Sequence, residues 1–342
     1  MPRRVLFLQT AADQITRYED AAMRLGVQLV PYDAVSSPNA AVGFARSAAI
    51  EACLAADSRA AIVAAVVAAS LGLPGHSAAS VEVARNKLLT RERLRDTDLL
   101  VPWFFPTSTT ASAPSLGAMV EFPCVLKPLV PCSGRGVMRA DDGPAFVRAF
   151  GELKAFLQSG EFKNESAEDR QTALVEGYID GWEFALEGVV HHGILDAFAL
   201  FDKPDPMEGP RFDDSLWVAP SLAPEPMQWD ILDAVTRAIT ATGLRHGPVH
   251  AECRVGDRGV FVLGVTPRPL GDGWAKALRF QKDGRGAKIS YEELLLRHAL
   301  GEAAESWRRE TDATGARRTG TGFVYATGSS SDEVERSLRS AV

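Results

Sequence analysis

A lysine that closes an apolar run and precedes a glycine-rich turn is the first arrangement in this chain that could do chemistry. Lys127 lies near the end of the run Phe122 to Pro128, and the turn Ser133-Gly134-Arg135-Gly136 follows it. An ammonium group supplies charge for phosphate oxygens, and glycines let backbone N–H groups approach them closely. Taken alone, such a turn is more typical of an ordinary hairpin, so the prediction of a phosphate site depends on its neighbours.

Further charged residues flank this lysine in the sequence. Asn86-Lys87 lies in a helical pattern upstream, where a single lysine is usually only solvated. Downstream, a strand-like run ends in Glu176, and Glu183 follows after a turn. Two exposed carboxylates at a strand end are the alternative interpretation. Neither Asn86-Lys87 nor the pair of acids Glu176 and Glu183 indicates a binding site without the other.

A third set of residues, His250 to Arg268, indicates two strands joined by the turn Gly256-Asp257-Arg258-Gly259. A hairpin brings the start of its first strand beside the end of its second, so Glu252 is expected to face Gly264 and Thr266. A second acid at either position would complete a metal site. Glu252 is the acid among these three residues, so the sequence places one carboxylate, and not a pair, at this point of the hairpin.

The histidines and cysteines offer no other metal site at the sequence level. His246, His250 and the pair His191-His192 have no partner at metal-ligand spacing, so they are interpreted as turn or core residues. The four cysteines are far apart and form no C-x-x-C pair, which argues against a disulfide framework and against a cysteine zinc site. Their use favours a reducing cytoplasm.

The elements that must position these residues begin with an open α/β sheet. Hydrophobic patterns predict a strand at Val5 to Gln9, a helix from about Asp13 to Gly26 and a strand at Val27 to Val30. The turn 10–13 lacks the glycines of a dinucleotide fold. Alanine-rich helical segments at 43–71 and 78–96 follow, separated by Gly72-Leu73-Pro74-Gly75.

A second unit is expected to start near residue 100, because short strands bounded by glycines follow the polar connector Thr107 to Ser115. Strands at Glu183 to Val190 and Ile194 to Lys203 flank the turn 191–193, and a helix from about Gln228 to Gly243 leads into the hairpin. A helix at Tyr291 to Leu300 and a short run at 323–325 follow.

Charge and hydropathy exclude several classes of partner. Thirty-seven Lys and Arg against 44 Asp and Glu give a formal charge of −7, which argues against nucleic acid. The longest apolar tract, Ala60 to Leu73, is too short to span a bilayer, and Asp13 and Arg17 interrupt any signal sequence. A cytoplasmic protein without a membrane partner is expected.

Together, and in this order, the motifs resemble those of the ATP-grasp superfamily. The matching features are Asn86-Lys87, Val125-x-Lys127-Pro128, Ser133-Gly134-x-Gly136-Val137, Val175-Glu176-x-x-Ile179-x-Gly181-x-Glu183, His250-x-Glu252 and Pro267-Arg268. The resemblance covers about residues 80–275 and is strongest to carboxylate–amine ligases of the L-amino acid type. It implies an N-terminal open α/β pre-ATP-grasp domain at 1–78 and a two-subdomain ATP-grasp domain at 79–303. The implied nucleotide-covering subdomain spans about 115–180, and 304–342 form a short C-terminal segment.

The resemblance also implies a role for each motif residue. Lys87 and Lys127 would bind ATP phosphates beneath a loop that contains Ser133, Gly134 and Gly136. Glu176 and the backbone near Ile179 would hold adenine, Glu183 the ribose hydroxyls, Glu252 a magnesium ion, and Arg268 the acylphosphate or the substrate carboxylate. An ionised carboxylate accepts hydrogen bonds only, so Glu183 suits two hydroxyl donors. Lys203, Asp213-Asp214 and Pro220-Ser221 resemble the variable substrate-facing segment.

The implied activity is ATP-dependent ligation of a small carboxylic or amino acid to an amine through an acylphosphate. ATP and Mg²⁺ would take part, with a second Mg²⁺ in doubt because Gly264 and Thr266 replace ligands; Asp272 is the nearest substitute. The alternative is an ATP-binding homologue with reduced or lost catalysis. The expected partners are small carboxylates and amines, and a homodimer is left open.

Overall fold

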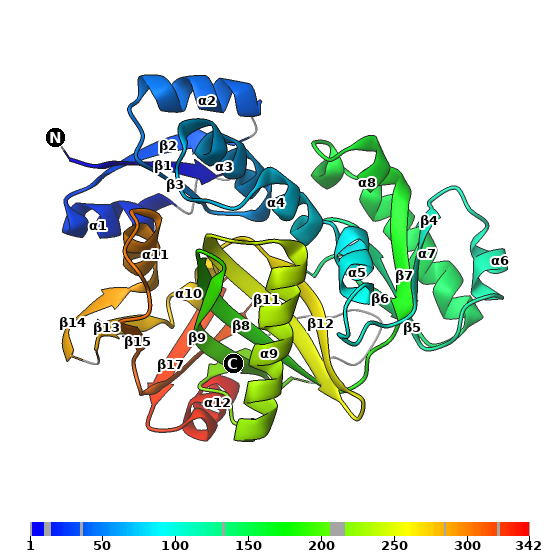
Figure 1. The fold of residues 1–342 in the computed structure, drawn as a ribbon. Coiled ribbons are helices and arrows are strands. Elements are labelled where there is room, and N and C mark those ends of the chain that lie inside the picture. Colours follow the sequence, from blue (N-terminus) through cyan, green and yellow to red (C-terminus); the bar gives the residue numbers. More distant parts are fainter. Residues whose placement is uncertain are drawn as a thin grey trace.

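The computed structural model describes residues 2–9, 15–34, 37–131, 134–205, 216–283, 285–319 and 322–341, and the side chains of all of these except Asp272 and Arg285. Their strands form four sheets. Figure 1 shows the N-terminal unit in blue at the upper left, a small sheet at the right and the largest sheet in the centre. Ser133 and Asp213-Asp214 lie outside the described residues.

The N-terminal unit is a parallel sheet of order β2-β1-β3, as predicted for an open α/β start. It contains β1 (Arg4–Gln9), β2 (Gln28–Asp33) and β3 (Ala52–Ala55), with α1 (Ile15–Leu25), α2 (Pro38–Ser47) and α3 (Ser58–Leu71). The prediction of one helical segment over 43–71 is wrong, because β3 divides it. Alanine and cysteine carry little strand signal, and β3 owes its conformation to pairing with β1.

A single helix over 78–96 is also wrong, because the segment forms α4 (Ala78–Arg85) and α5 (Lys87–Arg95). Asn86 between them is extended, with φ −92° and ψ 113°, and its Oδ1 accepts hydrogen bonds from the N–H groups of Leu88 and Leu89. Asparagine is a favoured N-cap for this reason. The break places Lys87 in the first turn of α5.

The small sheet is antiparallel, with order β4-β7-β5-β6. Its strands are β4 (Phe104–Ser108), β5 (Cys124–Pro128), β6 (Met138–Ala140) and β7 (Thr172–Gly177), with α6 (Ala113–Gly117), α7 (Gly143–Leu157) and α8 (Ala167–Gln171) beside them. The buried face of α7 packs on this sheet through Phe146, Phe150 and Leu153. β4 was not predicted. It lies at the edge of the sheet, which is where a strand tolerates a proline such as Pro106, because proline has no N–H group to donate.

The large sheet has the order β12-β11-β8-β9-β10-β16-β17. The predicted hairpins are present as β8 (Trp182–His191) with β9 (Ile194–Lys203) and as β11 (Gly247–Gly256) with β12 (Gly259–Thr266). The strands β10 (Leu216–Ala219), β16 (Ala313–Thr319) and β17 (Gly322–Gly328) complete it. The helix α9 (Glu225–Thr242) covers one face, through Ile231, Val235 and Ile239.

The opposite face of the large sheet packs against the segment that follows the second hairpin. That segment contains α10 (Asp272–Ala275), β13 (Arg279–Lys282), β14 (Arg285–Ser290), α11 (Tyr291–Ala299) and β15 (Trp307–Arg309). Phe201 and Trp217 of the sheet share a core with Trp274 and Tyr291. The chain continues into α12 (Ser331–Ser340), which packs on β16 and β17. No helix within the described ranges has both the length and the apolar composition that crossing a bilayer requires.

Candidate active site

Lys127, Glu176 and Arg91 form a buried charged cluster on the small sheet. Lys127 of β5 lies diagonally across from Glu176 of β7 on the same face, and the two side chains form an ion pair. Arg91 of α5 donates from Nε to Glu176 Oε2 at 3.0 Å and from Nη2 to Oε1 at 3.4 Å. The structure thus brings together two of the predicted nucleotide-binding residues and adds an arginine.

Burial and the nearby carboxylate of Glu176 shift the pKa of Lys127 in opposite directions. Burial lowers the pKa of Lys127 to about 8, although Glu176 favours the protonated lysine. The same value reflects repulsion from Arg91 and Lys87, so Lys87 lies within electrostatic reach of Lys127. Lys87 Nζ also donates to the carbonyl of Val130 at 3.2 Å. Two lysines that repel each other favour a bound anion.

The described part of the glycine loop passes beside Pro128, the residue after Lys127, because a Cβ atom on Gly136 would lie 3.1 Å from its ring. Gly134 and Gly136 have φ of 79° and 74°, a left-handed conformation that glycine adopts without strain and that occurs in anion-binding backbone turns. A Cβ atom on Gly136 would lie 2.5 Å from a ring carbon of Phe156, so no larger residue fits without displacing that ring. These features suit close approach to phosphate.

Glu183 begins a row of charged residues that crosses the large sheet. It pairs with Lys203 of β9 on one side and with Arg254 of β11 on the other. Lys203 Nζ lies 2.7 Å from Glu183 Oε1, and Arg254 Nε lies 2.9 Å from Glu183 Oε2. Arg254 also donates to the carbonyl of Ile179 at 2.8 Å. Glu183 and the backbone of Ile179, both predicted site residues, therefore meet at Arg254.

The second hairpin has the pairing that was predicted from sequence. Glu252 lies directly opposite Gly264, and His250 lies opposite Thr266, so all four positions share one face. Lys203 Nζ lies 2.6 Å from Glu252 Oε1. Burial raises the pKa of Glu252, but Lys203, His250 and Arg268 outweigh it and bring the pKa to about 2. Arg268 is thereby placed within electrostatic reach of Glu252.

Arg268 is positioned by the chain that follows it. Its Nη1 donates to the carbonyl of Pro269 at 2.8 Å, and the N–H of Leu270 donates to Glu187 Oε1 at 3.0 Å. Glu187 is fully buried and also accepts hydrogen bonds from Tyr291 and His250. This network fixes the backbone beside Arg268 to strand β8. It holds a half-buried guanidinium at the edge of the sheet face that carries Glu252.

The donor set at Glu252 suits one magnesium ion better than two. Mg²⁺ is commonly bound by one or two carboxylates together with substrate phosphates. Gly264 has no side chain and Thr266 offers a neutral hydroxyl, so Glu252 is the carboxylate among these facing positions. The side chain of Asp272 lies outside the described residues. A single ion held by Glu252 and phosphate oxygens fits, whereas a bridged pair would find no second carboxylate at the facing positions 264 and 266.

The sequence of the middle of the chain matches a known domain family. The ATP-grasp domain model matches residues 120–276, a range that includes Lys127, Glu183, Glu252 and Arg268. These residues, slightly less than half of the chain, are thus similar in sequence to an ATP-grasp domain. Uncharacterized protein y4rH of Sinorhizobium fredii is 28% identical over 250 residues, which make up 72% of this chain and 48% of that protein. The chain therefore spans about half the length of this relative.

Solved structures show that the ATP-grasp fold extends beyond the matched range. The L-amino acid ligase from Bacillus licheniformis has a TM-score of 0.80 at 21% identity, over 99% of this chain and 97% of that one. Carboxyaminoimidazole ribonucleotide synthase from Aspergillus clavatus, complexed with ATP, has a TM-score of 0.71 at 15% identity, over 99% and 97%. At these identities the likeness establishes the fold, which confirms the predicted fold class.

Three charged residues that the structure places in these clusters were not predicted to take part in the site. No role was predicted for Arg91 or Arg254, and Lys203 was predicted only as part of the variable substrate-facing segment. Arg254 could have been found, because residues two apart on a strand share a face and Glu252 precedes it by two. Arg91 carried no comparable signal, since its partner Glu176 is 85 residues away.

Proposed function

We propose that the protein is an ATP-dependent carboxylate–amine ligase that acts on a small carboxylic or amino acid. The observation that carries the proposal is a pair of charged clusters, one on each sheet, with Arg91 bonded to Glu176 of the small sheet and to the carbonyl of Val262 in the large sheet. Lys127 and Glu176 belong to the small sheet, Glu183 and Lys203 to the large sheet, and Glu252 and Arg268 lie beside them. We also propose the domain division 1–78, 79–303 and 304–342.

The nucleotide would lie between the two sheets. Lys87 and Lys127 would bind its phosphates beneath the loop containing Ser133, Gly134 and Gly136. Glu183 would accept from the ribose hydroxyls, and Glu176 with the backbone near Ile179 would hold adenine. Arg91 and Lys127 already engage Glu176, yet a carboxylate has about four lone-pair sites, which leaves acceptor capacity for a further donor.

Two bond exchanges would complete the reaction. A substrate carboxylate oxygen attacks the γ-phosphorus of ATP, and the bond from that phosphorus to the ADP oxygen breaks. An amine nitrogen then attacks the acyl carbon, and inorganic phosphate leaves with the bonding electrons. Arg268 would hold the carboxylate or its phosphorylated form by paired N–H donors. A magnesium ion at Glu252 would neutralise phosphate charge.

The substrate side of the site combines a cation with aromatic rings. Lys203 Nζ lies 4.6 Å from the centre of the Trp217 ring, which stacks on Trp274 at 4.6 Å. Lys203 is almost completely buried and bonded to two carboxylates, Glu183 and Glu252. A substrate carboxylate could replace one of these two partners while Lys203 stays paired with the other. This arrangement supports a small acid with an apolar part.

The test is release of ADP from ATP and Mg²⁺ in the presence of pairs of amino acids and small carboxylates. We expect at least one pair to stimulate ADP release and to yield a ligated product by mass spectrometry. Arg268→Ala should lower kcat/KM by about 100-fold or more if it removes a transition-state contact of several kcal/mol. Arg258→Ala, at the exposed turn of the same hairpin, is the matched control and should retain the activity. No stimulation across a broad panel by a protein that binds ATP contradicts the proposal.

A second candidate is an ATP-binding protein without turnover. Gly264 and Thr266 favour it, because they occupy the positions that face Glu252 and supply no carboxylate. The same assay separates the two candidates. Stoichiometric ATP binding with ADP release at the level of Arg268→Ala would support the binding protein, whereas substrate-dependent release supports the ligase.

A further inference from the structure

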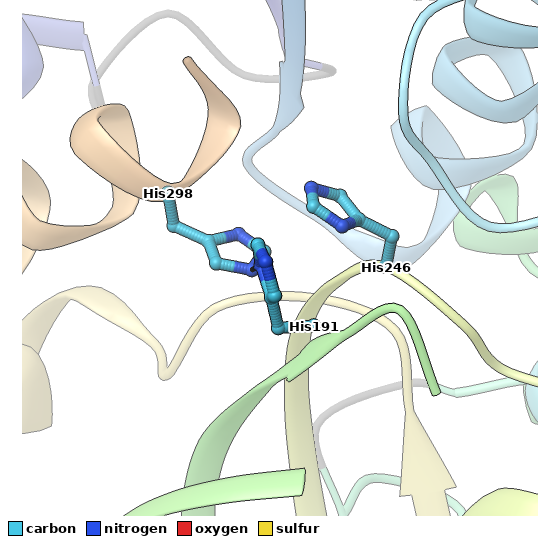
Figure 2. A group of neighbouring side chains, drawn as sticks. All are labelled: His191, His246 and His298. Atoms are coloured by element: carbon cyan, nitrogen blue, oxygen red, sulfur yellow. Dashed lines mark hydrogen bonds between the residues drawn. The ribbon is translucent and has the colours of Figure 1, made fainter. Parts of the chain in front are cut away.

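Five of the six histidines gather at one junction of the fold, although they come from four separate parts of the sequence. His76 lies between α3 and α4, His191 ends β8, His192 lies in the following turn, His246 precedes β11, and His298 lies in α11. Ring centres of His191, His246 and His298 are separated by 4.4, 5.2 and 5.4 Å. Figure 2 shows these three rings approaching one another from three separate elements. This corrects the interpretation of His191 and His246 as isolated turn or core residues.

The nitrogen positions match the dimensions of a metal site. One ring nitrogen from each of His191, His246 and His298 lies within 4.8 Å of the other two. His191 Nδ1 and His298 Nε2 are 3.4 Å apart. Zinc–nitrogen bonds of about 2.0–2.1 Å at tetrahedral angles place ligand nitrogens roughly 3.3–3.4 Å apart. One edge of the triangle already has this length, and His246 would need only a small movement.

His246 has no other use for its ring nitrogens within the described part of the chain. The residue is buried, and neither Nδ1 nor Nε2 makes a hydrogen bond there. A buried polar atom without a partner pays its full desolvation cost, so such atoms are rare in folded proteins. A metal ion would satisfy one of these nitrogens. The ring of His246 also stacks on that of His298, with an interplanar angle of 22°.

The surroundings keep these imidazoles neutral, which is the form that binds metal. Burial, together with repulsion from the neighbouring histidines, lowers the pKa of His246 to about 4 and that of His298 to about 3. Two protonated rings at this separation would repel each other strongly. At neutral pH a metal ion therefore has no proton to displace from either ring.

His76 positions the cluster. Its Nδ1 accepts hydrogen bonds from the N–H groups of Arg245 at 3.1 Å and His246 at 3.3 Å, so its proton lies on Nε2. A protonated nitrogen and an occupied one leave His76 no lone pair for a metal. It instead fixes the backbone that carries His246. A small cavity of about 50 Å³ borders His76, His246 and His298 and reaches the N-terminal sheet.

We propose that His191, His246 and His298 form a binding site for a divalent transition metal ion, with Zn²⁺ as the ion that fits. Imidazole nitrogen is a ligand for zinc and its neighbours, whereas Mg²⁺ takes oxygen ligands, so this site is chemically distinct from Glu252. The ion would tie the end of β8, the loop before β11 and α11 together where the N-terminal unit meets the large sheet.

The experiment uses the full chain without a polyhistidine tag, stripped with a chelator that is then removed. We expect titration with ZnCl₂, followed calorimetrically, to give one tight equivalent and a rise in Tm. The single variants His246→Gln and His298→Gln should each weaken zinc binding by about 100-fold or more, since a ligand is lost. Metal content after gel filtration should fall in parallel.

Two matched variants locate the ion. His250→Gln removes the one histidine outside the cluster, and Glu252→Gln removes the predicted magnesium ligand; both should keep the zinc equivalent. Addition of Co²⁺ reports the site independently, because tetrahedral nitrogen coordination gives intense visible absorption that His191→Gln should abolish. The proposal is overturned by the lack of a stoichiometric equivalent, by unchanged binding in folded His246→Gln and His298→Gln, or by loss of zinc in Glu252→Gln.

Discussion

At the scale of single residues, Lys127 is the group whose chemistry depends most on its surroundings. Burial lowers its pKa to about 8, while Glu176 opposes that shift by favouring the charged form. An ammonium is useful to a phosphate only while it is protonated. The strength of nucleotide binding is therefore expected to depend on pH in the range where Lys127 titrates.

The first prediction is that ATP binding weakens as the pH rises above about 8. Below the lowered pKa of Lys127, the lysine is charged in the free protein and binding needs no proton uptake. Above that pKa, binding must first protonate the lysine, so Kd should rise by up to about tenfold per pH unit. Isothermal titration from pH 6.5 to 9.5 measures the slope.

The control for this prediction is Lys127→Arg. A guanidinium stays charged throughout this pH range, so the slope should disappear even if the absolute affinity changes. Equal slopes in the natural protein and in Lys127→Arg would assign the pH dependence to another group.

At the scale of elements, sequence prediction succeeded where contacts are local. Both hairpins of the large sheet were predicted, because their strands are adjacent in the chain and alternate clearly. The second one was predicted to bring Glu252 near Gly264, which is confirmed. Its exact register does not follow from the turn, because a β-bulge between Glu252 and Cys253 shifts the pairing by one residue. In contrast, β3 and β4 have weak local signals and depend on distant partners, β1 and β7.

The hairpin can be used to restore the missing metal ligands. Gly264 is not among the described glycines with positive φ, and a Cβ atom there meets no atom within 4 Å. The backbone at position 264 can therefore carry a residue with a side chain without strain. We predict that Gly264→Glu with Thr266→Asn raises the affinity for Mg²⁺ in the presence of ATP by about tenfold or more.

The measurement is a titration of Mg²⁺ against the ATP complex by calorimetry. Gly264→Ala with Thr266→Asn is the matched control, since it adds bulk without a carboxylate and should leave the affinity nearly unchanged. Tight binding of two ions by the natural protein would show that other residues supply the ligands.

The glycine loop offers a second test at this scale. Gly136→Ala would introduce a Cβ atom 2.5 Å from the Phe156 ring in a backbone with φ of 74°. We expect it to destabilise the protein by about 1–2 kcal/mol, the usual cost of a left-handed non-glycine residue, and to weaken ATP binding. Gly264→Ala should do neither, because its Cβ has open space. Denaturant unfolding and ATP titration of both variants decide it.

At the scale of the whole molecule, the features that could not be predicted from the sequence are contacts between segments that lie far apart in the chain. The histidine cluster collects residues from position 76 to position 298, so no spacing rule applies to it. Arg91 is similar: it is fully buried in α5 and joins Glu176 of the small sheet to the carbonyl of Val262 in the large sheet, at 3.1 Å from Nη1. A sequence pattern indicates which face of a helix or strand is buried, but it seldom indicates which other element packs against that face.

Arg91 therefore sets the position of the small sheet against the large one. A buried arginine that holds a carboxylate cannot be removed cheaply, because the carboxylate loses its partner in a low-dielectric environment. We predict that Arg91→Met lowers the free energy of unfolding by about 3–5 kcal/mol, the range found when one partner of a buried ion pair is removed. ATP affinity should also fall, because Lys127 and Glu183 would no longer be held at a fixed separation.

The matched variant is Arg93→Met, which lies on the same helix and is exposed. It should change neither quantity by more than about 0.5 kcal/mol, as is usual for surface substitutions. Denaturant unfolding gives the stability, and titration of the folded fraction gives the affinity. If Arg91→Met is destabilised but binds ATP normally once folded, Arg91 is a structural anchor that does not set the distance between the two sheets. Equal stability of the two variants would mean that the existing ion pair with Lys127 is sufficient to compensate the buried charge of Glu176.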